Sequence, residues 1–251
     1  MALYENVPTP ARRLPGQSLR DQKQQLTENW LIPLYFTAAF CWLLWFVIDQ
    51  QARSQRPPHP KLYLCLAIVA TGVLAIKFGR LFAQFRRLNR GERGELLVAE
   101  QLEELRSIGF RCFHDLVRNG FNIDHVVVGP SGVYAIETKY RSGSGAIEFR
   151  NGQGVVVDGR EEERDCLKQA RGSASALRKL IGQDANLQVS VKALVVFVGD
   201  WKIKGAWQST DVRLLAANQL RDYFSQQDQP ELTGREIDLI CSHLNRTARV
   251  D

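Results

Sequence analysis

Two acidic residues and a lysine occupy positions that a single β-hairpin would bring together. The run IDHVVVGPSGVYAIETK has β-branched residues on both sides of a Gly-Pro-Ser-Gly turn, a pattern typical of a hairpin. With this four-residue loop Val128 lies opposite Val133, and counting outward places Asp124 opposite Glu137. Lys139 follows Glu137 by two residues, so it lies on the same face of its strand. The sequence therefore predicts a cluster of Asp, Glu and Lys at the open end of the hairpin.

Carboxylates that face each other across a sheet repel, so Asp124 and Glu137 call for a cation or a proton between them. Magnesium prefers carboxylate oxygens and neutralises charge where a phosphodiester is attacked. A lysine beside it can steady the attacking water or the developing negative charge. The alternative is that Glu137 and Lys139 form a solvated pair while Asp124 only opens its strand. A bulge in the hairpin would also change the register and separate the carboxylates.

Two apolar stretches in the N-terminal third predict a pair of membrane spans. Residues 30–48 carry no charge, and residues 62–82 carry charge only at Lys77 and Arg80. Each stretch has about the 20 residues that cross a bilayer. Lys and Arg favour the outer flanks over the loop between the stretches, which places both flanks in the cytoplasm. We therefore expect an integral inner- or plasma-membrane protein with a transmembrane helical hairpin over residues 30–85, its N-terminus and C-terminal domain being cytoplasmic.

The regions around the spans carry further indications. Residues 1–29 are polar and contain several prolines, which predicts a disordered tail. The second span has a small residue at every fourth position, and this lines one helix face for close packing against another helix. The partner would be the first span or a second copy of the chain, which would give a homodimer. The small residues are Ala67, Thr71, Ala75, Gly79 and Ala83.

Composition and motifs narrow the classes of function. The net charge of +6 fits a nucleic-acid partner, anionic lipid or the orientation signal of the spans, and much of it lies beside the spans. The five cysteines lack the spacing of a zinc site, and we interpret them as packing residues. The sequence contains no phosphate-binding loop, dinucleotide fingerprint, His-Glu-x-x-His motif or Gly-x-Ser-x-Gly elbow. Enzymes that depend on these motifs are therefore excluded.

Residues 89–251 are enough for one compact domain. An amphipathic helix is expected to follow Gly91–Glu95 and to end at Gly109. The hairpin strands and a flexible segment at Ser142–Gly145 come next. A second hairpin, a helix at about 162–181, a buried strand and a capped final helix complete the order. This order predicts an α/β domain with a mixed sheet flanked by helices.

Three other titratable residues have competing interpretations. His114 and His125 are interpreted as structural, because single histidines at strand positions are more often structural than catalytic. Glu95 lies at the expected start of a helix, where the helix dipole favours an acidic side chain. Its position is therefore explained either by helix initiation or by a functional role.

Four blocks of the sequence, taken in order, resemble the NERD domain, the nuclease-related branch of the PD-(D/E)XK nuclease superfamily. The resemblance is close from Gly91 to Arg150 and looser through the helix that contains Gln169. It implies a restriction-endonuclease-like core and hydrolysis of phosphodiester bonds that depends on Mg²⁺, with Mn²⁺ as the alternative ion. The implied substrate is DNA, with RNA as the alternative. The blocks are Gly91–Glu95, Asn122–Val128, Gly129–Val133 and Ile136–Lys139.

The resemblance also implies roles for the matching residues. Ile123 stands in place of the proline in the superfamily's name, and Glu92 is the alternative to Glu95 as an accessory acid. Because the superfamily includes inactive relatives, the alternative function is a non-catalytic membrane scaffold that binds nucleic acid or a protein partner. By the resemblance, Asp124 and Glu137 bind the metal ion and Lys139 assists the attacking water. Glu95 is the implied accessory acid from the first helix, and Gln169 is a polar contributor from the second.

Overall fold

The chain divides into two compact units, Leu19–Arg90 and a second unit in which Met1–Ser18 joins Gly91–Asp251. Of the region expected to form one domain from residue 89 onward, residues 91–251 lie in a single unit, which also includes Met1–Ser18. The computed structural model describes residues 13–54, 60–118, 121–150, 154–161, 165–185, 187–204, 211–227 and 229–247.

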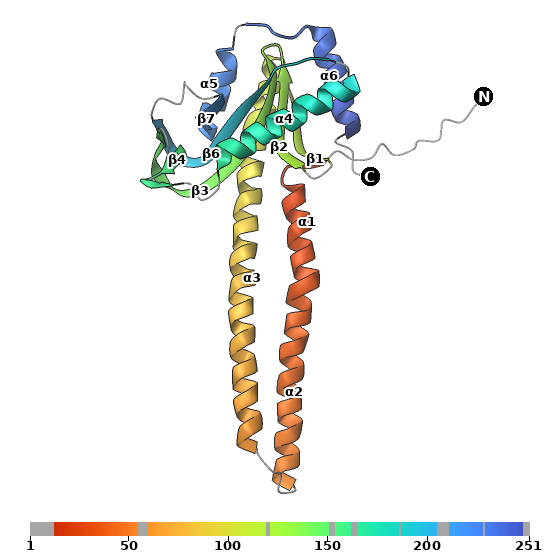
Figure 1. Ribbon diagram of the computed structural model, residues 1–251, viewed down its shortest axis with the longest axis vertical. Helices are drawn as coiled ribbons and strands as arrows, with labels where there is room; N and C mark the ends of the chain where they lie inside the picture. The colour runs from red at the N-terminus through yellow and green to blue at the C-terminus, as the bar shows by residue number, and fades with distance from the viewer. Residues whose placement is uncertain are drawn as a thin grey trace, which may run out of the picture. The chain divides into compact units, whose positions relative to one another are not determined.

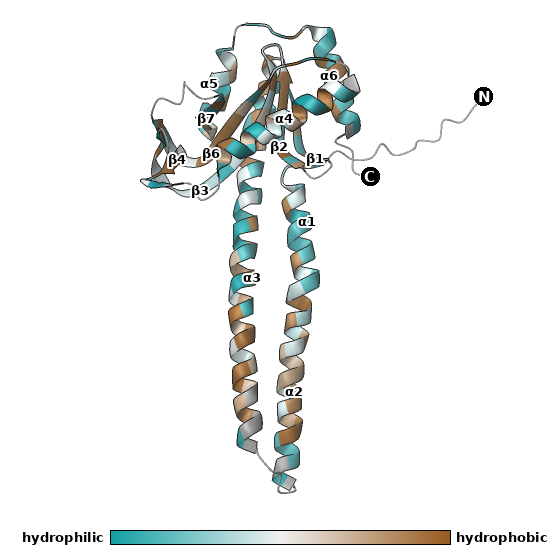
Figure 2. Ribbon diagram, in the orientation of Figure 1, coloured by the Kyte–Doolittle hydropathy of each residue, from teal (hydrophilic) through white to brown (hydrophobic). Residues whose placement is uncertain are grey.

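The unit Leu19–Arg90 consists of long helices. Helix α1 (Gln17–Leu26) continues through a π-helical turn, η1 (Thr27–Leu31), into α2 (Ile32–Ser54), and α3 runs over Pro60–Glu103. Figure 2 shows hydrophobic residues along most of α2 and along the first half of α3. Both helical regions contain a stretch long and apolar enough to cross a membrane.

The expected disordered tail over residues 1–29 is helical from Gln17 onward. Leu, Arg, Lys and Gln dominate α1, and all four are good helix formers. The side-chain oxygen of Gln17 also accepts a hydrogen bond from the N–H of Leu14 (3.0 Å) at the start of the helix. Helix propensity therefore outweighs the polar composition here. Residues 1–12 of the expected tail lie outside the described part of the chain.

Among the residues whose side chains the structure describes, the small-residue face expected on the second span is mostly exposed, with Ala67 half-buried. A Cβ added to Gly79 would meet nothing within 4 Å, and the side chains of Thr71, Ala75 and Ala83 are exposed. The two helical segments instead share an apolar groove whose lining is mostly aromatic. These contacts therefore lend no support to the first span as the partner of the small-residue face. The groove is lined by Leu31, Ile32, Tyr35, Phe36, Phe78, Leu81, Phe82 and Phe85.

The second unit is built on a seven-stranded sheet (Figure 1). Strands β1 to β5 pair antiparallel in chain order, whereas β6 lies parallel to β3 and β7 lies parallel to β6. The sheet is therefore mixed, as predicted. The strands are β1 (Arg111–Arg118), β2 (Phe121–Gly129), β3 (Gly132–Arg150), β4 (Gly154–Val157), β5 (Arg160–Glu161), β6 (Val191–Lys204) and β7 (Val212–Ala216).

Helices cover both faces of this sheet. Alternate residues of β3 enter different hydrophobic clusters: Val133 packs in a cluster with residues of α4 and α6, and Tyr134 packs in a cluster with residues of α3 and α5. Figure 1 shows α4 lying across one face. The predicted α/β class is confirmed, and the arrangement is consistent with a restriction-endonuclease-like fold. The helices of this unit are α4 (Cys166–Ala185), α5 (Leu220–Ser225) and α6 (Gly234–Thr247), with a 3₁₀ turn, η4 (Ala217–Gln219), before α5.

Helix α3 passes without a break through the positions where a helix start was expected. Gly94 and Glu95 lie in its interior, and the helix ends after η2 (Glu104–Ile108) at Gly109, whose φ of 90° is typical of a helix C-terminus. A Cβ added to Gly94 would lie 2.9 Å from the Cβ of Tyr140 on β3. Gly94 therefore allows close packing of helix on strand and does not mark a boundary. Because Glu95 is not in a first turn, helix initiation does not explain it.

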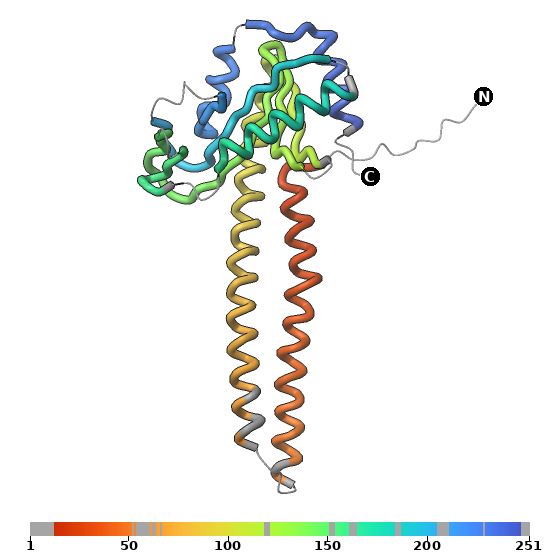
Figure 3. Tube along the Cα trace, viewed as in Figure 1, coloured from red at the N-terminus to blue at the C-terminus, as the bar shows by residue number. Residues whose placement is uncertain are grey.

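The segment Ser142–Gly145, expected to be flexible, is part of the long strand β3, whose course can be followed by residue colour along the Cα trace in Figure 3. β3 pairs with β6 on both sides of this segment, with one irregularity in the register. A Cβ added to Gly145 would lie 3.4 Å from the ring of Trp201. The glycines therefore make room for a tryptophan and do not form a loop.

Candidate active site

Strand pairing brings Asp124 and Glu137 to neighbouring positions at the open end of the β2–β3 hairpin. The observed register runs without a shift from the turn to His125 opposite Ile136. The next position along the two strands holds Asp124 and Glu137, as the count from the sequence predicted. A one-residue slip would exchange the residues that pack in the two hydrophobic clusters, Val126 and Val128 in one and Val127 in the other.

Hydrogen bonds hold four of the predicted residues in one place. The backbone N–H of Thr138 donates to Oδ2 of Asp124 (2.8 Å). Nζ of Lys139 donates to Oε1 of Glu137 (2.7 Å) and to Oε1 of Gln169 on α4 (2.7 Å). The side chains of Glu137 and Lys139 are only 11% and 12% exposed, so solvent screens this ion pair little.

Glu95 of α3 adds a third carboxylate. Its burial, reinforced by nearby Asp115 and Glu137, raises its pKa to about 8. The backbone N–H of Gly16 donates to one carboxylate oxygen and acts in the opposite direction, while Oε2 has no hydrogen-bond partner among the described residues. Burial also raises the pKa of Asp124 well above its usual range, and Glu137 and Glu95 add to that shift. These mutual effects place three carboxylates in one electrostatic cluster.

Glu92, the alternative accessory acid, has a weaker electrostatic effect on the carboxylate cluster than Glu95 has. It makes the smallest contribution among the causes that raise the pKa of Glu95. The charges that act on Asp124 are those of Glu137, Glu95 and Lys139. The electrostatic contacts therefore favour Glu95 as the third member of the cluster.

The carboxylate cluster fits a hard divalent cation. Three carboxyl groups meet one cationic side chain, Lys139, and Oε2 of Glu95 is buried without a partner in the described part of the chain. A cation held by Asp124 and Glu137 would offset the excess negative charge of the cluster. Within the described ranges, no three His, Cys, Asp or Glu side chains are placed to hold a metal ion by themselves. Magnesium commonly takes one or two carboxylates and fills its shell with water and substrate phosphate, so the cluster fits an open site.

The structure adds a fourth carboxylate that the sequence analysis missed. Asp115 on β1 occupies the register position opposite Asp124, is fully buried and raises the pKa of Glu95. Its φ of 51° lies in the left-handed region, which Asp tolerates better than most residues. Its Oδ2 accepts hydrogen bonds from Nε of Arg13 (2.8 Å) and from the N–H of Ser18 (2.9 Å).

A second turn in the sequence also predicts the position of Asp115. The dipeptide Asn119-Gly120 is typical of a two-residue hairpin loop. Counting back from such a loop pairs Arg118 with Phe121, as observed, and places Asp115 opposite Asp124. The same count that located Glu137 would therefore have found Asp115. Its partner Arg13 has no comparable signal, because the two residues lie 102 positions apart.

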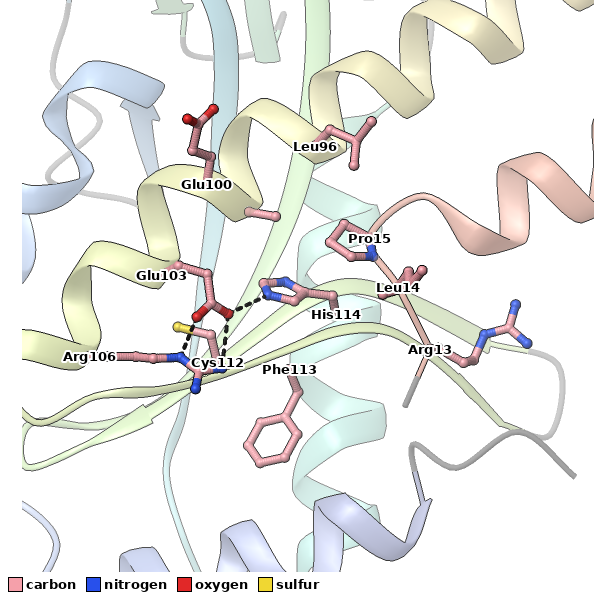
Figure 4. A pocket seen from close by; sticks show the side chains of 11 residues that line it. Arg13, Leu14, Pro15, Leu96, Glu100, Glu103, Arg106, Cys112, Phe113 and His114 are labelled. Atoms are coloured by element: carbon pink, nitrogen blue, oxygen red, sulfur yellow. Dashed lines mark hydrogen bonds and ion pairs between the residues drawn. The ribbon is translucent and has the colours of Figure 1, made fainter. Parts of the chain in front are cut away.

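The two histidines outside the predicted site, His114 and His125, form a hydrogen bond with each other. Nδ1 of His114 lies 2.8 Å from Nδ1 of His125, and Nε2 of His114 lies 3.2 Å from Oε1 of Glu103. Burial lowers the pKa of both histidines, which favours their neutral forms. His114 then donates to Glu103 and accepts from His125. Figure 4 shows Glu103 bridging His114 and Arg106, whereas Nε2 of His125 is buried without a hydrogen-bond partner among the described residues.

A cavity of about 380 Å³ lies beside this network, between the segment Arg13–Pro15, α3 and β1 (Figure 4). Its lining includes Leu96 and Phe113, and also Glu103, Arg106 and His114 of the histidine network. None of the five predicted site residues lines it. The cavity is therefore distinct from the carboxylate cluster.

Comparison with known protein families gives a match to part of the chain. No curated protein and no solved structure matches the chain. Residues 90–198 match the model of the NERD family, described as a nuclease-related domain. This stretch contains Glu95, Asp124, Glu137, Lys139 and Gln169. On the evidence of both the match and the fold, residues 90–198 are similar to the nuclease-related domain, NERD.

Proposed function

We propose that the protein is a membrane-anchored, metal-dependent nuclease that hydrolyses phosphodiester bonds of DNA. The observation that carries the proposal is the meeting of Glu95, Asp124 and Glu137 with Lys139 and Gln169 in one partly buried cluster. Similarity to a nuclease-related domain supports the same chemistry. RNA is the alternative substrate.

In this proposal Asp124 and Glu137 hold Mg²⁺, with Mn²⁺ as a substitute, and Glu95 is the accessory acid. The ion, when bound, neutralises charge on the phosphate that is attacked. Asp124 is oriented by the N–H of Thr138, which fixes one oxygen and leaves the other for the ion. Removal of either ligand would leave a single carboxylate ligand and therefore a weaker cation site.

Lys139 and Gln169 position the attacking water in this scheme. An ammonium group has three protons, and two of those on Lys139 are used by Glu137 and Gln169. These bonds hold Nζ beside the carboxylates, and we assign the third proton to the attacking water or to a phosphate oxygen. Positive charge there stabilises the negative charge that develops during attack.

Membrane anchoring is the second part of the proposal. The supporting observation is that α2 and α3 contain stretches long and apolar enough to cross a membrane, over about residues 30–48 and 62–82. The flanking Lys and Arg residues support a cytoplasmic N-terminus and a cytoplasmic nuclease-related domain in this proposal, with the spans in the inner or plasma membrane. The exposed small residues of α3 would pair two copies into a homodimer.

The test is cleavage by the purified full-length chain in detergent. Labelled single- and double-stranded DNA and RNA are incubated with Mg²⁺, Mn²⁺ or a chelator, using wild type, Asp124→Asn and Lys139→Met. Asp238→Asn is the matched control, because Asp238 is an exposed aspartate of α6 in an ion pair with Arg111. We expect wild type and Asp238→Asn to cleave with metal only, and the two site variants to lose on the order of 100-fold or more. Equal cleavage by all four proteins would contradict the proposal.

A non-catalytic scaffold is the second candidate, and the exposed small-residue face of α3 favours it. Such a protein would bind nucleic acid or a protein partner through the nuclease-like fold. Wild type would then bind DNA without cleaving it, and Glu137→Gln would leave the binding unchanged. Loss of binding in Glu137→Gln would argue for the nuclease site.

A further inference from the structure

The segment Arg13–Ser18 lies outside the nuclease-related stretch but contacts its carboxylates. Nε of Arg13 donates to Oδ2 of Asp115 (2.8 Å), and the backbone N–H of Ser18 donates to the same oxygen (2.9 Å). The hydroxyl of Ser18 also accepts a hydrogen bond from the side-chain amide of Asn122 on β2 (3.1 Å). Both ends of the segment are therefore attached to Asp115 or to the strand next to it.

Asp115 depends on this segment for its counter-charge. It is fully buried, and a buried carboxylate without a cation is strongly unfavourable. The side chain of Arg13 is itself only 17% exposed, so the attraction between the two charges is little screened. Without Arg13 the carboxylate of Asp115 would add uncompensated negative charge next to Glu95.

Gly16, in the middle of the segment, contacts the cluster through its backbone. Its N–H donates to the carboxylate of Glu95, while Oε2 of Glu95 has no partner among the described residues. Its φ of +71° favours glycine, and a Cβ there would lie 3.0 Å from Cγ of Glu92. Glycine therefore lets the backbone approach Glu95 and hold one carboxylate oxygen.

We propose that Arg13 is a positioning residue of the metal site. By anchoring the segment on Asp115, Arg13 holds Gly16 against Glu95 and so fixes the Glu95 carboxylate beside the two proposed metal ligands. This inference rests on the proposed metal-dependent function. The site is then composite in sequence, because Arg13 precedes the two long helical stretches and Asp124 and Glu137 follow them. A domain cut from residue 89 onward would lack the segment.

The test uses the full-length chain in detergent as wild type, Arg13→Ala and Arg13→Lys. The matched control is Arg111→Ala, because Arg111 also forms an ion pair from β1 with an aspartate, Asp238 (2.7 Å), but on the exposed surface. Binding of Mn²⁺ alone is measured by electron paramagnetic resonance. Amide hydrogen exchange over residues 13–18 reports separately whether the segment is docked.

We expect the amides of Gly16 and Ser18 to be protected in wild type and Arg111→Ala, and to exchange rapidly in Arg13→Ala. Arg13→Ala should weaken Mn²⁺ binding on the order of tenfold, as is typical for residues that orient metal ligands. Arg13→Lys keeps the charge but loses the guanidinium geometry, so it should recover most of the affinity. Recovery by Lys distinguishes positioning from a general loss of folding.

Each other outcome overturns the inference in a recognisable way. Unprotected amides in wild type would show that the segment is not docked, whatever the function of the domain. Lost protection with unchanged Mn²⁺ affinity in Arg13→Ala would show that the segment does not position Glu95. Absence of Mn²⁺ binding in a folded wild type would overturn the proposed metal-dependent function, and this inference with it.

Discussion

Replacing Glu95 by glutamine is expected to make the metal-free protein more stable at neutral pH. The pKa of Glu95 is raised by burial and by neighbouring carboxylates from 4.5 to about 8. Below pH 4.5 the carboxyl group is protonated in both the folded and the unfolded chain, so it costs nothing. Between pH 4.5 and 8 the unfolded chain has released a proton that the folded protein keeps, and the free energy of unfolding falls as the pH rises.

The size of this loss follows from the pKa difference. Each pH unit in the window lowers the free energy of unfolding by up to about 1.4 kcal/mol. At pH 7, roughly 2.5 units into the window, the loss is on the order of 3 kcal/mol. Glu95→Gln removes the titrating group but keeps an oxygen that can accept the N–H of Gly16. The variant should therefore be more stable than wild type at pH 7 and equally stable near pH 4.

The assay is thermal unfolding of the full-length chain in detergent with a chelator at pH 4, 5, 6, 7 and 8. A destabilisation of about 1 kcal/mol lowers the midpoint by a few degrees, so the difference between wild type and Glu95→Gln should widen measurably with pH. Glu100→Gln is the control, because Glu100 is an exposed carboxylate on the same helix. Parallel pH profiles for wild type and Glu95→Gln, or a less stable Glu95→Gln at pH 7, would refute the reasoning.

Three further substitutions test separate features. Gly94→Ala should lower the free energy of unfolding by about 1–3 kcal/mol, because its Cβ would lie 2.9 Å from the Cβ of Tyr140; denaturant unfolding measures this, and an unchanged midpoint would contradict it. Lys139→Met should destabilise the metal-free protein by about 2–3 kcal/mol, because it leaves Glu137 unpaired. In thermal unfolding, added Mg²⁺ should restore the stability of this variant, and a variant that Mg²⁺ does not stabilise would argue against a cation site. Thr233→Ala should cost about 1 kcal/mol, because its hydroxyl accepts the N–H of Glu236 at the start of α6 (3.3 Å); a neutral change would show that this cap contributes little.

The hairpin was predictable because local rules determine it. The Gly-Pro-Ser-Gly turn and the buried valines on both sides specify one register, and the observed pairing of His125 with Ile136 follows that register. The neighbourhood of Asp124 and Glu137 was therefore available from the sequence. The closeness of Glu137 to Lys139 followed from the alternation of side chains along the strand alone.

Glycines misled the prediction where their role is tertiary. Gly94 resembles a helix boundary in the sequence, but it lies inside α3 because that helix packs closely on Tyr140. Gly145 resembles part of a flexible loop, but it lies inside β3 because the ring of Trp201 occupies the space beside it. In both cases the neighbour that explains the glycine is distant in sequence, so no local pattern identifies it.

The contacts of the N-terminal segment could not be predicted for a similar reason. Arg13 is one of several basic residues in a polar stretch, and its interaction with Asp115 spans 102 positions. The left-handed φ of Asp115 also has no signal in the sequence. These features depend on how the start of the chain folds onto the strands, which the sequence patterns do not encode.

The most direct test of the metal site is Mg²⁺ binding by calorimetry to the full-length chain. Wild type is compared with Asp124→Asn and Glu137→Gln, and Glu148→Gln is the control because Glu148 is a carboxylate of the same strand that is paired with Arg150. We predict that wild type and Glu148→Gln bind Mg²⁺, and that both site variants lose binding together with DNA cleavage. A folded wild type that binds no Mg²⁺, or site variants that bind it as wild type does, would contradict the assignment of Asp124 and Glu137 as metal ligands.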